Sequence, residues 1–83
     1  MPQNVQQATG VIIEAVRRER EGLGALLEDV GRWEIDSRAV KAFCEEGSFL
    51  YEKLRQTDIR DLVEKVAREC FGPSVVFKVL SEA

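Results

Sequence analysis

The sequence changes its periodicity abruptly at Gly72-Pro73, and this change constrains the fold more than any other feature. The residues before it follow helical spacing, whereas SVVFKVL after it has the composition and alternation of a strand. Glycine commonly ends a helix, and proline cannot continue one. A strand at this place needs partners from much earlier in the chain. We therefore expect it to complete a sheet made of distant segments, and to be required for folding.

Two earlier segments have the alternation that such partner strands need. In RWEID, Trp33 and Ile35 share one side and the charged residues share the other. AVKAFCE follows after a two-residue connector, with small apolar residues on one face and Phe43 on the opposite face. These segments, 32–36 and 39–45, predict a β-hairpin.

The first third of the chain has a helical apolar stripe over residues 11–30, which one long helix could satisfy. Two features favour a break. Glu19 falls on the stripe, and Gly22 and Gly24 each cost a helix interior about 1 kcal/mol relative to alanine. We predict two short helices hinged near residues 20–22, with the first starting at Thr9-Gly10. The polar residues before it, 1–9, are expected to form a flexible segment that precedes a domain spanning 10–83.

The segment 48–71 is also helical, and Ser48 is a plausible N-cap. At the angular step of a helix, Leu50 and Leu54 fall opposite the apolar stripe that follows them. The simplest explanation is a break at Gln56-Thr57, with Thr57 capping a new helix. The alternative is that Leu50, Tyr51 and Leu54 form an exposed apolar patch for a partner.

These elements predict an α+β fold with two layers, in the order α-α-β-β-α-α-β, in which a three-stranded sheet packs against helices. The core face of the last strand is expected to hold Val75, Phe77 and Val79. Its other face holds Val76 and Leu80, and only Lys78 interrupts it. A sheet covered on one side should be polar on the other. Either the N-terminal helices cover this second face, or it binds a partner.

The single tryptophan, Trp33, has two possible structural roles. It can be a core anchor beneath the helices, or a contact residue on an open sheet face, since tryptophan is enriched at interfaces. The candidate partner-binding residues are therefore Trp33, Leu50, Tyr51, Leu54, Val76 and Leu80.

The 83 residues suffice for one domain, and their chemistry argues against an enzyme. There is no histidine, so sites that depend on one are excluded. Cys44 and Cys70 lack the paired spacing of a zinc site and are interpreted as reduced, packed thiols. No glycine-rich phosphate-binding motif occurs. We predict no catalytic residue, no metal site and no cofactor.

Charge and hydropathy narrow the possible partners. Fifteen acidic and twelve basic residues give a net charge of −3, and the basic residues are dispersed along the chain. This pattern disfavours direct nucleic-acid binding, which usually needs a basic stripe. No apolar run is long enough to cross a bilayer, and no signal peptide is apparent, so we expect a cytoplasmic protein.

The order of these features resembles the small C-terminal domain found in many bacterial gamma/tau subunits of DNA polymerase III, the clamp-loader component that also ties the polymerase together. The similarity covers about residues 10–80. It is carried by VIIEAVRRER, Ala25-Leu26-Leu27, AVKAF ending at Phe43, IRDLVEKVARECFG ending at Gly72, and SVVFKVL. The order of strands and helices is also similar to KH-like folds, although the GxxG loop that clamps nucleic acid is missing.

The resemblance implies a non-catalytic protein-interaction domain of the DNA replication machinery. It implies docking on the polymerase alpha subunit or another holoenzyme subunit, with the clamp-loader ATPase in an earlier part of the parent chain. Two other functions remain open at this point. One is a KH-like nucleic-acid-binding module, and the other is a homodimerisation domain that uses the edge or the second face of the last strand.

Overall fold

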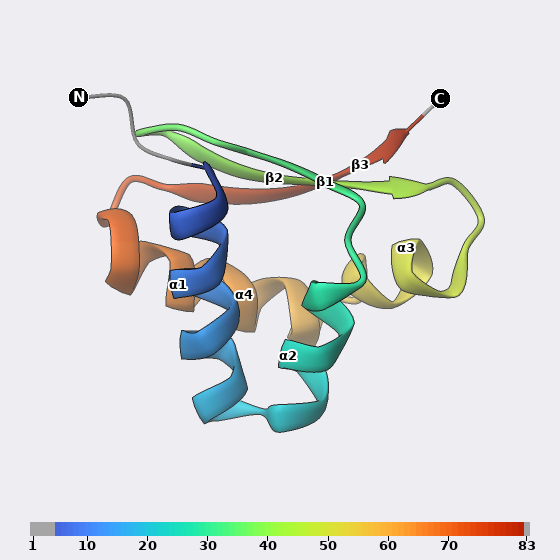
Figure 1. The fold of residues 1–83 in the computed structure, drawn as a ribbon, viewed down its shortest axis with the longest axis horizontal. Coiled ribbons are helices and arrows are strands. Elements are labelled where there is room, and N and C mark those ends of the chain that lie inside the picture. The colour runs from blue at the N-terminus through green and yellow to red at the C-terminus, as the bar shows by residue number, and fades with distance from the viewer. Residues whose placement is uncertain (1–4, 83) are drawn as a thin grey trace.

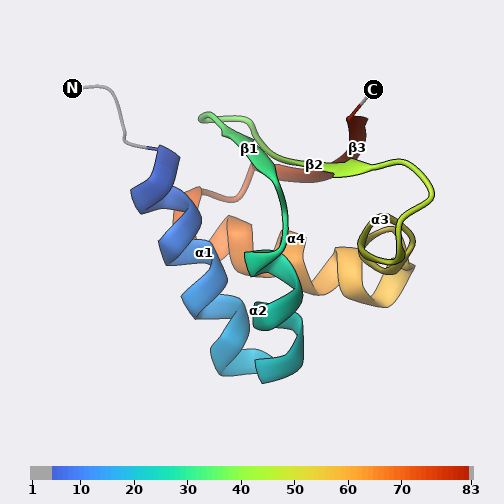
Figure 2. The ribbon, with the colours of Figure 1, turned by 45° about the vertical axis from the view of Figure 1, so that its right-hand side comes forward.

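The computed structural model describes residues 5–82, and these form four helices and three strands in the predicted α-α-β-β-α-α-β order. The elements are α1 (Val5–Glu19), α2 (Glu21–Glu28), β1 (Arg32–Ile35), β2 (Ala39–Glu45), α3 (Phe49–Leu54), α4 (Thr57–Phe71) and β3 (Val76–Glu82). The predicted α+β class and two-layer arrangement are confirmed. All four helices lie on the same side of the sheet (Figures 1 and 2).

The sheet is mixed, with strand order β1-β2-β3. β1 pairs antiparallel with β2, and Trp33 stands opposite Ala42. β2 pairs in parallel with β3, and Val40 stands beside Phe77. The last strand therefore completes the sheet as predicted, and it does so on the side of β2 that the hairpin leaves free.

The core lies between the sheet and the helical layer. Its largest fully buried side chains are Ile12, Val16, Leu27, Val40, Leu54, Val63, Val66 and Val75. From the last strand and the turn before it, Val75 and Phe77 are buried and Val79 packs against the core, as the alternation predicted. Cys44 is buried, and Cys70 is partly buried.

The N-terminal helical region is broken where the sequence predicted. Arg20 has extended backbone angles (φ −147°, ψ 107°) between α1 and α2. The predicted start at Thr9-Gly10 is wrong, because α1 already begins at Val5. Ala8 is buried one turn before Ile12, so the apolar stripe extends into the segment that was expected to be flexible. The rest of that segment, residues 1–4, lies outside the described residues.

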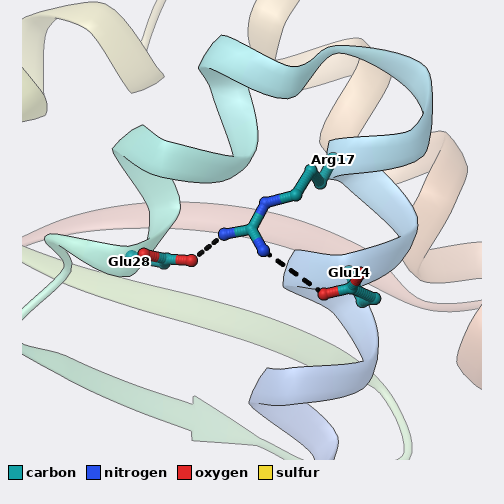
Figure 3. Close-up of polar contacts among 3 residues, drawn as sticks. All are labelled: Glu14, Arg17 and Glu28. Carbon is teal, nitrogen blue, oxygen red and sulfur yellow. Dashed lines mark hydrogen bonds and ion pairs between the residues drawn. The ribbon is translucent and has the colours of Figure 1, made fainter.

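α1 and α2 pack closely as an antiparallel helical pair. Gly24 permits this contact, since a Cβ at that position would lie 2.8 Å from the Cβ of Arg17. The Arg17 guanidinium then bridges the two helices, and it pairs with Glu14 of α1 at 3.4 Å and with Glu28 of α2 (Figure 3). A glycine and an ion pair thus join the same two helices.

The second helical region is also broken near Gln56-Thr57, as predicted. Ser48 caps α3, since the Tyr51 N–H donates to the Ser48 Oγ at 3.1 Å. The N-cap of α4 is Gln56 and not Thr57. The Gln56 side chain makes no capping hydrogen bond. The break rotates α3 relative to α4, which turns Leu54 completely into the core. The alternative of an exposed patch at Leu50, Tyr51 and Leu54 is therefore wrong.

Within residues 5–82, no helix combines the length and apolar character needed to cross a membrane.

Candidate protein-interaction surface

One face of the sheet is covered by none of the four described helices, and we call it the open face (Figures 1 and 2). Strand alternation places on it the residues out of phase with the core-facing Val40, Ala42 and Phe77. The described side chains of the open face are those of Arg32, Glu34, Ala39, Lys41, Phe43, Glu45, Val76, Lys78 and Leu80.

An apolar row crosses the open face. Register places Arg32 of β1, Phe43 of β2 and Leu80 of β3 side by side. The Arg32 guanidinium carbon lies 4.5 Å from the centroid of the Phe43 ring, a cation–π contact that covers one end of the row. Phe43 and Leu80 are only half-buried. Side chains of this kind on an uncovered sheet face are suited to contact with another protein.

A charged row runs next to the apolar row. Glu34, Lys41 and Lys78 are neighbours across the three strands. Glu34 pairs with Arg32, whereas Lys41 and Lys78 stand directly beside each other. Like charges opposite one another on neighbouring strands destabilise a sheet. Lys78 makes no ion pair with any residue in the described part of the chain.

The candidate residues from the sequence do not gather at one place. Val76 and Leu80 lie half-buried on the open face. Trp33 belongs to the opposite face, where it packs against the core. Leu50 and Tyr51 also pack against the core from α3, and Leu54 is fully buried.

Phe43 is the open-face residue that the candidate set lacked. Its signal was present in the sequence, because Phe43 is out of phase with the small apolar residues of β2. A second missed aromatic residue is Phe49, at the first position of α3, which is 72% exposed. Phe49 follows directly after the N-cap, so helical phase alone did not indicate its exposure.

A groove of about 660 Å³ lies between α1 and α4. Gly10, Val11, Ala15 and Arg18 line it from α1, and Cys70 lines it from α4. Val11 is 51% exposed there. Burial, followed by the nearby Glu69 carboxylate, raises the pKa of the Cys70 thiol. The thiol is therefore less nucleophilic at neutral pH than a free cysteine.

No group of three histidine, cysteine, aspartate or glutamate side chains among the described residues is arranged to hold a metal ion. Comparison with known proteins identifies no relative, since neither a protein-family model nor any curated protein or solved structure matches the chain.

Proposed function

We propose that this domain is a non-catalytic protein-interaction module that binds its partner through the open face of the sheet. The observation that carries the proposal is the half-buried apolar row of Phe43 and Leu80 on the face that none of the helices within residues 5–82 covers. Val76 extends this apolar surface beside Ala39. Antiparallel and mixed sheets tolerate an uncovered face when it is polar. An apolar row on such a face therefore indicates a binding surface.

The resemblance to the C-terminal domain of bacterial gamma/tau subunits suggests the partner. We propose that the domain acts in the DNA replication machinery, in the cytoplasm, and docks on the alpha subunit of DNA polymerase III or another subunit of that assembly. The arrangement of the open face supports a protein partner, because Glu34 and Glu45 lie among its basic residues and the described side chains form no continuous basic stripe.

Titration calorimetry of the domain against a purified bacterial polymerase alpha subunit tests this proposal. We expect saturable binding that the Phe43→Ala substitution weakens by about tenfold or more, the loss expected when an aromatic hot-spot residue is truncated. Val11→Ala is the matched control, since it removes an exposed apolar side chain from the helical layer. Thermal unfolding of each variant verifies that the fold is retained.

Two outcomes would count against the proposal. One is no binding at tens of micromolar protein, and the other is equal weakening by the Phe43 and Val11 substitutions. Binding of single-stranded DNA or RNA that weakens steeply with salt would instead support a nucleic-acid-binding module.

A further inference from the structure

The last strand, β3, has one unpaired edge. β3 is an outer strand and pairs only with β2 among the described residues. Its backbone bonds alternate in direction. The Val76 N–H donates to the Arg38 carbonyl on the β2 side at 3.0 Å, whereas the Phe77 N–H donates to the Glu64 carboxylate at 3.0 Å. By this alternation, the N–H and C=O groups of Val79 and Ser81 point away from β2.

α4 covers the first part of this edge. Glu64 accepts the Phe77 N–H, and the Arg68 Nε donates to the Val75 carbonyl at 2.9 Å. Glu64 and Arg68 also pair with each other at 3.3 Å. No comparable side-chain bond to the backbone of Val79 or Ser81 is present in the described part of the chain. The edge is therefore capped as far as Phe77 and left open from Val79 onward.

The charges beside this open edge are arranged unfavourably within one copy of the chain. Lys78 stands next to Lys41 in the register of β2 and β3, and like charges on neighbouring strands destabilise the pairing. A partner strand that set an acidic residue beside Lys78 would relieve this repulsion.

A second copy of the same strand has this property. We propose that two copies of the chain associate through the β3 edges, antiparallel and centred on Leu80, to form one continuous six-stranded sheet. In this register, Val79 of each copy lies opposite Ser81 of the other, and the two residues exchange backbone hydrogen bonds. Position 78 then faces position 82 of the second copy, which is a glutamate in the sequence.

The apolar row supports the same register. Leu80 meets its own counterpart at the two-fold axis, and Phe43 lies beside Leu80 in each copy. The two apolar rows therefore join into one, with Arg32 at each outer end. A register centred on Val79 instead would set Lys78 against Leu80 of the second copy. The contact centred on Leu80 is self-complementary, which is the form that two-fold dimer interfaces take.

Sedimentation equilibrium on the isolated domain tests the dimer independently of any polymerase partner. The interface is small, so we expect a monomer–dimer equilibrium detectable up to ~1 mM protein, in the weak class of contacts below about 1,200 Å². Lys78→Glu and Glu82→Lys should each weaken self-association by about tenfold or more, because each turns two attractive cross-strand pairs into repulsive ones. Arg18→Glu makes the same charge change at an exposed position of α1, away from the β3 edge, and serves as the control.

Mixing the variants gives the decisive result. Lys78→Glu and Glu82→Lys variants in equal amounts should form a mixed dimer, since their charges are complementary only to each other. The double variant should associate as the original chain does. Slower amide exchange of Val79 and Ser81 at high concentration would locate the contact. A monomer up to ~1 mM, or a dimer insensitive to both single substitutions, would overturn the proposal.

Discussion

Gly24 of α2 lies so close to Arg17 of α1 that a Cβ on Gly24 would approach the Arg17 Cβ to 2.8 Å and its Cα to 3.0 Å. The contact involves atoms fixed by the backbone, so a flexible side chain cannot simply move away. The two helices can approach this closely only because position 24 lacks a side chain. In the sequence, Gly24 was interpreted as a residue that destabilises a helix. In the structure, it is required for the close packing of α1 and α2.

Gly24→Ala should therefore destabilise the domain by about 1–3 kcal/mol, even though alanine is the better helix former, because overpacking outweighs propensity. Gly10→Ala is the matched control. Gly10 lies within α1, and a Cβ there would meet nothing within 4 Å. That substitution should stabilise by about 0.5–1 kcal/mol. Urea unfolding measures both changes, and effects of the same sign would contradict the close-packing interpretation.

Leu54→Ala should destabilise the domain by about 2–5 kcal/mol, since it removes a completely buried side chain. Leu50→Ala, one helical turn earlier, should cost less than half as much, because Leu50 is only partly buried. Chemical denaturation of the two variants under the same conditions provides the comparison. A larger loss at Leu50 would mean that α3 is rotated from the orientation described above.

Glu64→Ala should cost about 1–3 kcal/mol, because it leaves the part-buried Phe77 N–H without its acceptor. Glu64→Gln keeps an acceptor oxygen and should cost clearly less. Amide exchange at Phe77, measured by NMR, should accelerate in the alanine variant and change little in the glutamine variant. If both variants exchange at the original rate, the carboxylate does not protect this edge.

Asp36 makes the hairpin connection sensitive to acid. Its carboxylate accepts the backbone N–H of Arg38 at 2.7 Å and that of Ala39 at 2.9 Å, and these bonds lower the pKa of Asp36. A lowered pKa in the folded state means that the stabilisation is present above the ordinary value of 3.8 and is lost as the pH falls through the folded-state value.

Asp36→Ala should therefore lower the melting temperature at pH 6, and the difference from the original chain should shrink as the pH falls below the ordinary value of 3.8. Asp36→Asn keeps an acceptor oxygen without the charge, so it separates the hydrogen bonds from the ionisation. A difference that stays constant over this pH range would exclude Asp36 as the source of the acid sensitivity.

The sequence predicted the architecture well because its signals are local. Gly72-Pro73 marked the last strand, and the phase conflict between Leu54 and the following stripe marked the break before α4. The error at the start of α1 has a tertiary cause. Thr9-Gly10 looks like a helix entrance, but buried Ala8 extends the apolar stripe by one further turn, and tertiary burial outweighed the signal.

The candidate surface was only partly predictable. Alternation alone placed Val76 and Leu80 on the open face. The meeting of Phe43 with Leu80, and of Lys41 with Lys78, depends on the register between strands that are distant in the chain. No local pattern encodes that register, so neither row could be read from the sequence. The same limit explains why Trp33 remained ambiguous between core and surface.

Parallel pairing of β2 with β3 has a consequence for how the chain folds. Each β2 residue pairs with the residue 37 positions later, and α3 and α4 fill the interval. The α1–α2 hairpin and the β1–β2 hairpin need only nearby contacts, so they can form early and reversibly. Pairing β3 with β2 closes a long loop, and the loop loses conformational entropy. This loss comes before the β2–β3 contacts that compensate for it have formed. Substitutions that weaken the β2–β3 contact should therefore slow folding itself.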